Sequence, residues 1–173
     1  MSSPPHAPAA PAWSAPGWSP QSWRALPIKQ QPRYGDAEKL EAALAEVRRL
    51  PPLVDAVRRS DRPVVWICDP MHGNTETVVP QSGAGKGVPV KTRKFGHVLA
   101  EVEQAFEIHR AAGTWLGGIH VELTGENVTE CTGGARGLAD EQLAVAYRSA
   151  VDPRLNYEQS LELAMLIARR MAR

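Results

Sequence analysis

Two short segments, the apolar run at 64–68 and the strand-like segment at 118–123, constrain the fold of this chain most, because each leads into polar residues and a glycine. Between them a helical pattern of apolar residues begins near Phe95 and ends at Gly113, and a second helical pattern covers 157–171. Strands that alternate with helices in this way pair in parallel. The sequence therefore predicts an α/β fold in which both segments are strands of one sheet and the strand at 64–68 is buried.

Polar residues gather where these segments end. An acid, a histidine and a glycine occur within residues 69–75, a second polar stretch covers 124–127, and a third opens at Asp152, before the last helix. Such residues at the carboxyl ends of parallel strands form the active-site rim of α/β barrels. A closed barrel needs eight strands and roughly 200 residues or more. A chain of 173 residues with two evident strands cannot close one alone.

Three regions follow one another along the chain. Residues 1–36 are rich in proline and carry Trp13, Trp18 and Trp23, which predicts an irregular arm. We expect a disordered tail over 1–12 and docking of 13–34 on the body or on a neighbouring subunit, because each tryptophan can bury a large apolar area. Residues 37–60 are predicted to be helical, with Asp36 as the cap and Pro51–Pro52 as a stop. Residues 61–173 hold the strands and helices, with 76–90 as a loop.

Charge and cysteine content narrow the partners. Lys and Arg number 20 against 19 Asp and Glu, so no electrostatic case exists for a nucleic acid or an anionic membrane. Two cysteines are too few for a disulfide framework and suit a reducing cytoplasm. No apolar run reaches the length of a membrane span, and the N-terminus lacks the pattern of a secretory signal. We expect a cytoplasmic protein.

Several phrases of the sequence resemble the class II 3-deoxy-D-arabino-heptulosonate 7-phosphate (DAHP) synthases, the metal-dependent enzymes that open the shikimate pathway to aromatic amino acids. The matching phrases are WICDPMHGNT at 66–75, KTRKF at 91–95, GGIHVELTGENVTEC at 117–131, DPRLN at 152–156 and SLELA at 160–164. Shorter matches at 22–24, 30–34 and 50–54 resemble the start of the family.

The resemblance covers most of this chain but only the two ends of the family. It implies that the middle of the family's (β/α)8 TIM barrel is missing, with a join near residues 51–54. Under this resemblance, residues 61–173 are the C-terminal portion of the barrel, its last two β/α units, and follow an irregular arm and a helix. The fold is then a partial barrel segment of the α/β class.

The family's chemistry implies a metal site. Carbon 3 of phosphoenolpyruvate attacks the aldehyde of erythrose 4-phosphate, water adds at carbon 2 and phosphate leaves. By resemblance, His72, Glu122 and Asp152 match three of the four ligands of the divalent ion. These donor types suit Mn²⁺ first, with Co²⁺ or Zn²⁺ as alternatives. The fourth ligand of the family is a cysteine in the missing portion, which neither Cys68 nor Cys131 matches.

Each matched ligand also has a simpler interpretation from the residues alone. His72 can be a hydrogen-bonding loop residue, Glu122 an ordinary strand-end acid, and Asp152 a turn residue or the cap of the last helix. We expect His120 to have a structural or supporting role. Lys91, Arg93 and Arg154 are basic residues near the expected rim, and none of them is assigned as a substrate ligand.

Two functions remain open at this point. The first is DAHP synthase activity, with phosphoenolpyruvate and erythrose 4-phosphate as substrates. The alternative is a catalytically inactive, truncated homologue, either a relic or an interaction module. Open strand edges would let such a module associate with itself or with a full-length synthase.

Overall fold

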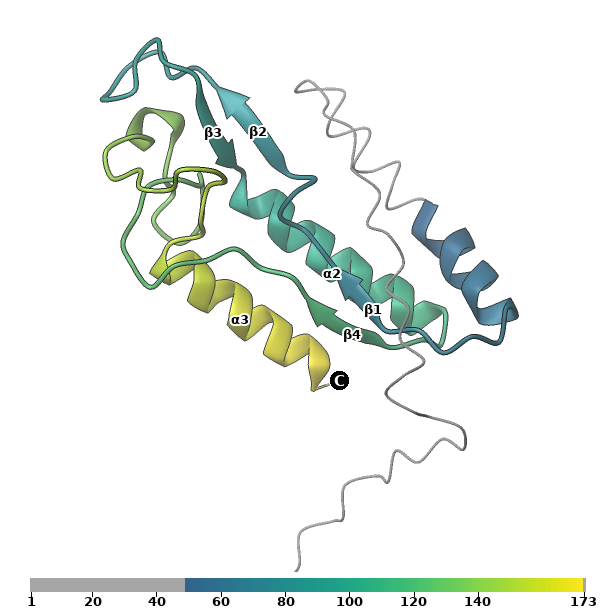
Figure 1. Ribbon diagram of the computed structural model, residues 1–173. Helices are drawn as coiled ribbons and strands as arrows, with labels where there is room; N and C mark the ends of the chain where they lie inside the picture. The colour runs from purple at the N-terminus through teal and green to yellow at the C-terminus, as the bar shows by residue number, and fades with distance from the viewer. Residues whose placement is uncertain (1–48, 173) are drawn as a thin grey trace, which may run out of the picture. The chain divides into compact units, whose positions relative to one another are not determined.

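The computed structural model describes residues 49–172 and has a mixed α/β architecture (Figure 1). In chain order its elements are a helical stretch at 49–59, β1 (Trp66–Cys68), β2 (Thr75–Val78), β3 (Val90–Arg93), α2 (Phe95–Ala111), β4 (Leu116–Ile119), the 3-10 turn η2 (Asp140–Gln142) and α3 (Tyr157–Met171). The expected arm at 1–36, the cap at Asp36 and the helix before residue 49 lie outside the described residues.

β1 and β4 form a parallel pair, which confirms the prediction from the alternating pattern. Trp66 is paired with Leu116, whereas Ile67 is paired with Gly118, so Gly117 is an extra residue on β4. Such an insertion is a β-bulge. The pairing continues past the strand ends, because the His120 amide donates to the Cys68 carbonyl at 2.8 Å. Both strands therefore end side by side, and their polar continuations start from one edge.

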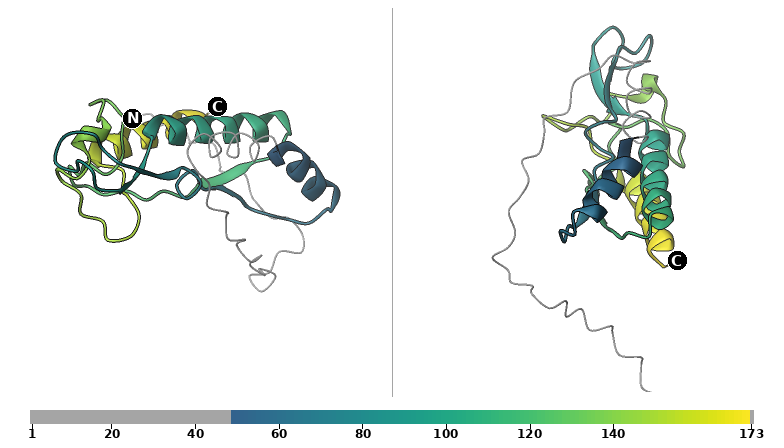
Figure 2. Two further views of the ribbon diagram at one scale, coloured as in Figure 1. Left: turned by 90° about the horizontal axis from the view of Figure 1, so that it is seen from above. Right: turned by 90° about the vertical axis from the view of Figure 1, so that its right-hand side faces the viewer.

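Helices pack on only one side of this pair in the described part of the chain. Figure 2 shows α2 and α3 on the same side of the two strands. The core holds seven buried residues: Met71, Phe95, Val98, Val102, Cys131, Leu155 and Leu163. Val65, just before β1, and Ile67 of β1 remain 50% and 56% exposed, and we call the surface that they form the open face. The prediction of a buried strand at 64–68 is thus wrong here, since a strand is buried on both faces only when two layers cover it.

An antiparallel pair occupies the two ends of the segment that was predicted to be a loop. β2 and β3 pair from Thr75 opposite Arg93 to Val78 opposite Val90. Only residues 79–89 between them connect the strands irregularly. The pairing fixes Lys91 and Arg93 beside the turn that follows β1.

Helix boundaries agree with the sequence at α2 and α3 and disagree at the prolines. Residues 49–59 are helical on both sides of Pro51–Pro52, so these prolines do not stop the helix. Pro51 and Pro52 each lack a backbone N–H, yet the helical backbone continues through both of them to residue 59. Gly113, with φ of +65°, ends α2 as predicted.

The cap of α3 is Asn156, not Asp152. Its side chain accepts a hydrogen bond from the Gln159 amide, and the Gln159 side chain accepts one from the Asn156 amide. This reciprocal pair satisfies two N–H groups that lack helical acceptors. Leu163 of α3 is buried, but Leu161 and Ala164, which were expected to face inward, are exposed. Asp152 therefore does not cap α3.

No helix within residues 49–172 combines the length and apolar character that a membrane crossing requires.

Candidate metal centre

Three side chains from separate parts of the chain meet beyond the ends of β1 and β4. His72 follows β1, Glu122 follows β4, and Asp152 precedes α3. One potential ligand atom from each lies within 4.8 Å of the other two. We call these residues, with the basic side chains that contact them, the polar rim. The sequence expectation that these three residues converge thus agrees with their position in the structure.

The turn after β1 fixes the ring of His72. One carboxylate oxygen of Asp69 accepts from the amides of Met71 (3.0 Å) and His72 (3.3 Å). Its other oxygen lies 2.7 Å from Nδ1 of His72. Burial alone would raise the pKa of Asp69, but these hydrogen bonds and the nearby imidazole outweigh burial and lower it. Asp69 is therefore ionised near neutral pH and orients the imidazole, as carboxylates do for metal-binding histidines.

Backbone pairing brings Glu122 next to the segment that carries Asp152. The Leu155 amide donates to the Glu122 carbonyl at 3.1 Å, and the Thr124 amide donates to the Leu155 carbonyl at 2.9 Å. Residues 122–124 therefore lie alongside 155 as a short parallel bridge. Because Asp152 is only three residues before Leu155, its carboxylate lies at the same edge as Glu122.

A buried carboxylate holds the loop around Asp152. Glu130 is 1% exposed, and its two oxygens accept from the amides of Arg148, Ser149 and Arg154 and from the Ser149 hydroxyl, at 2.6–2.8 Å. Burial alone would raise the pKa of Glu130, but the four hydrogen bonds lower it. No sequence pattern indicated this role, apart from the position of Glu130 in a phrase that matches the family.

Arg93 contacts the turn after β1, Glu122 and the loop before α3. It is fully buried, and it donates to the Met71 carbonyl (2.8 Å), the Thr75 hydroxyl (3.0 Å), the Pro153 carbonyl and the Glu122 carboxylate (2.6 Å). Each of its three nitrogens donates within the protein and the side chain is fully buried, so Arg93 is a positioning residue here and is not available to a substrate phosphate.

The other two basic residues of the rim remain partly exposed. Lys91 lies 3.2 Å from Asp152, and Arg154 lies 3.7 Å from Glu122. Each carboxylate of the rim thus has a cationic neighbour that restricts its orientation. Since each carboxylate oxygen has two lone pairs, both acids keep free acceptor positions for an ion.

His120 lies closer to the rim than a purely structural role requires. Its ring is stacked on that of His72, with centroids 5.5 Å apart and an interplanar angle of 23°. One ligand atom each from Asp69, His72 and His120 lies within 4.8 Å of the other two. The sequence signal that could have indicated this position of His120 was its place two residues before Glu122.

The cysteines do not take part in these groups. Neither Cys68 nor Cys131 belongs to a potential metal-binding group among the described residues. Burial raises the pKa of each thiol to about 12. Because a thiol binds metal as the thiolate, both cysteines are poor ligands at neutral pH.

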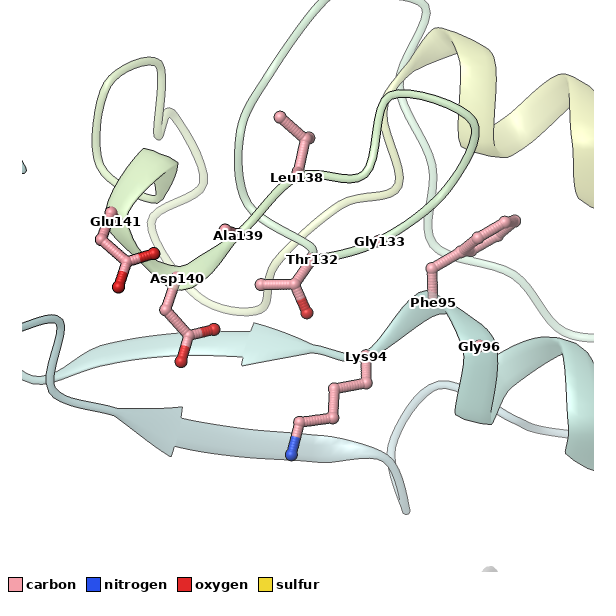
Figure 3. A pocket seen from close by; sticks show the side chains of 9 residues that line it. All are labelled: Lys94, Phe95, Gly96, Thr132, Gly133, Leu138, Ala139, Asp140 and Glu141. Atoms are coloured by element: carbon pink, nitrogen blue, oxygen red, sulfur yellow. The ribbon is translucent and has the colours of Figure 1, made fainter.

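A separate open pocket lies near the start of α2 (Figure 3). Lys94, Thr132, Asp140 and Glu141 are among its lining residues. None of the three matched ligands lines it. The pocket is therefore distinct from the polar rim.

The comparisons with known proteins all point to the same enzyme family. The model of the class-II DAHP synthetase family matches residues 18–57 and 48–168, and the two matches overlap across the expected join at 51–54. The chain is 53% identical over 119 residues to the phospho-2-dehydro-3-deoxyheptonate aldolase AroG of Mycolicibacterium smegmatis, covering 69% of this chain and 24% of that protein. It is 46% identical over 138 residues to the phospho-2-dehydro-3-deoxyheptonate aldolase of Neurospora crassa, covering 79% of this chain and 26% of that protein.

The chain thus spans about a quarter of the length of these two relatives. A protein of the same name from Streptomyces lividans is 50% identical over 118 residues, covering 67% of this chain and 75% of the relative. The matched family segments together include the turn after β1, both strands of the parallel pair and the loop before α3. On the strength of these matches, the chain belongs to the class II DAHP synthetase family.

Proposed function

We propose that this protein acts as a 3-deoxy-7-phosphoheptulonate synthase, which condenses phosphoenolpyruvate with erythrose 4-phosphate in the cytoplasm. The observation that carries this proposal is the approach of His72, Glu122 and Asp152 to within 4.8 Å of one another. These side chains come from three separate segments, and each segment lies within the family match. The names of the relatives support the same reaction.

His72, Glu122 and Asp152 are proposed to hold a divalent ion. One imidazole and two carboxylates are a donor set that suits Mn²⁺ first, with Co²⁺ or Zn²⁺ as alternatives. The spacing of their ligand atoms and the free lone pairs of both acids fit such an ion. When bound, the ion supplies Lewis acidity toward the aldehyde oxygen.

The chain's own residues prepare this site. Asp69 occupies Nδ1 of His72, which leaves Nε2 as the nitrogen available to the ion. Arg93 and Arg154 flank the carboxylate of Glu122 from two directions, and Lys91 holds one oxygen of Asp152. In the proposed reaction these cations keep the two acids in fixed positions, so that little reorganisation is needed when substrate arrives.

We further propose that β1 and β4 are neighbouring strands of a (β/α)8 barrel, within the C-terminal portion at 61–173. Their parallel pairing, with helices on one side and polar ends at one edge, supports this assignment. The exposure of Val65 and Ile67 fits a strand whose other neighbours belong to a second chain. In that case a second copy or a full-length synthase supplies the remaining barrel and the substrate pocket.

The proposal is tested by phosphate release from phosphoenolpyruvate in the presence of erythrose 4-phosphate and Mn²⁺. We expect the full chain to exceed His72→Ala, and His97→Ala, which changes a histidine on α2 outside the rim, to match the parent. Equal rates for the parent and His72→Ala would remove catalysis by this chain alone. Adding a full-length synthase inactivated at its own metal site then tests the alternative. Restored activity that depends on His72 would assign the chain a complementing role.

A further inference from the structure

The second group of potential ligands suggests a site that the proposed reaction does not use. Asp69, His72 and His120 each place one ligand atom within 4.8 Å of the other two. We propose that these three residues form a second, nitrogen-rich cation site, which takes Zn²⁺ or Co²⁺ and competes for His72 with the site built on Glu122 and Asp152. This inference shares the ligand His72 with the proposed function, and Asp69, which orients His72 there, becomes a ligand here.

The two histidines are arranged to close around an ion. Their rings are stacked 5.5 Å apart and both are exposed, so their nitrogens are reachable from solvent. In a tetrahedral zinc site with bonds of about 2.1 Å, ligand atoms lie roughly 3.4 Å from one another. Atoms already within 4.8 Å reach that spacing through small rotations of exposed side chains.

Asp69 completes the group as a fixed carboxylate. Its other oxygen is anchored by the amides of Met71 and His72. The oxygen that faces His72 lies 2.7 Å from Nδ1. An ion held by both atoms replaces this hydrogen bond, and the two atoms separate by less than about 1 Å to reach the ligand spacing of zinc.

The donor sets of the two sites predict different ions. Two imidazoles with one carboxylate suit zinc and cobalt, whereas one imidazole with two carboxylates suits manganese better. A neutral imidazole has only one acceptor nitrogen. His72 therefore serves one ion at a time, and binding at either site weakens binding at the other by the same factor.

Isothermal titration of the metal-free full chain with Zn²⁺ and, separately, with Mn²⁺ tests this arrangement. His120→Gln is expected to weaken Zn²⁺ binding at least about tenfold and to leave Mn²⁺ binding within about threefold. Asp152→Asn is expected to do the reverse. His97→Gln is the matched control and should change neither affinity. His120 is exposed, and circular dichroism checks that each variant folds.

The outcomes separate the second site from the proposed function. Unchanged Zn²⁺ affinity in His120→Gln, absent Zn²⁺ binding by the parent, or an equal loss of both metals in His120→Gln overturns the second site. If His120→Gln fails to fold, Asp69→Asn is titrated instead, and unchanged Zn²⁺ affinity there has the same meaning. Unchanged Mn²⁺ affinity in Asp152→Asn contradicts the proposed catalytic metal site and leaves the second site standing.

Discussion

The polar rim and the open face of β1 differ in how completely this chain surrounds them. At the rim, buried Arg93 and Glu130 make hydrogen bonds that join the turn after β1, the extension of β4 and the loop before α3. On the open face, Val65 and Ile67 remain about half exposed. The chain therefore contains the contacts that position the candidate ligands, whereas one surface of the strands that support them has no cover among residues 49–172.

The difference also concerns the type of interaction. The hydrogen bonds of the rim join segments that are all present in this chain, as at Glu130, whose partners Arg148, Ser149 and Arg154 lie within residues 49–172. Burial of a sheet face requires a second layer, which is supplied by distant sequence or another chain. A shortened member of a barrel family can thus keep its ligand geometry while its strands stay partly uncovered.

The largest expected effect comes from Arg93→Met, which removes the central contact of the rim. The substitution leaves the largely buried carboxylate of Glu122 without its closest cation, and we expect a loss of roughly 3–5 kcal/mol in the free energy of unfolding. Urea unfolding followed by circular dichroism measures it. Arg93→Lys keeps the charge but not the four donated bonds, so it should fall between Met and the parent. An unchanged urea midpoint for Arg93→Met would mean that the rim is held by other contacts.

Glu130→Gln should have the next largest effect. A glutamine amide presents its NH₂ to backbone N–H donors, so we expect a loss of about 2–4 kcal/mol at pH 7. The folded-state pKa of Glu130 is lowered, so its contribution is present above the unfolded pKa, about 4.3, and is lost as pH falls through the folded value. The difference in urea midpoint between parent and variant should therefore shrink below pH 4. A difference that stays constant down to pH 3 would contradict this assignment.

The smallest expected effects come from one substitution, valine to threonine, made once at a buried position and once at an exposed position. Val98→Thr places a hydroxyl in the core and should cost roughly 1–3 kcal/mol, whereas Val65→Thr on the open face should change stability by less than about 0.5 kcal/mol. Thermal unfolding of both variants gives the comparison. If Val65→Thr costs as much as Val98→Thr, then the face is covered in solution. Light scattering would then show whether the cover is a second copy.

The sequence predicted those elements whose signals are local. The helices α2 and α3 have apolar periodicity and clear ends, and the parallel pairing follows from alternation. The strand pair β2 and β3 was missed because its connection, 79–89, contains the prolines and glycines of a loop. The second strand was expected at 118–123 but occupies Leu116–Ile119. Gly117 lies inside this strand, where a side chain would come within 2.8 Å of Val65.

At the candidate site, family phrases identified His72, Glu122 and Asp152, but not what holds them. The contacts of Arg93 and Glu130 join segments 18 to 60 residues apart, which no local pattern reports. The exposure of Val65 and Ile67 could not be predicted from their apolar character, because the burial of a strand depends on which other segments pack against it.

The extra residue on β4 has a consequence for how such a site can change. Successive side chains of a strand point to opposite faces, so the count of residues between Leu116 and Glu122 decides the direction of the later side chains. Deletion of Gly117 would remove the bulge, so the residues on one side of it would shift by one position, and a shift of the later residues would turn His120 and Glu122 away from His72. A single lost codon can thus disturb ion binding although every ligand residue is kept.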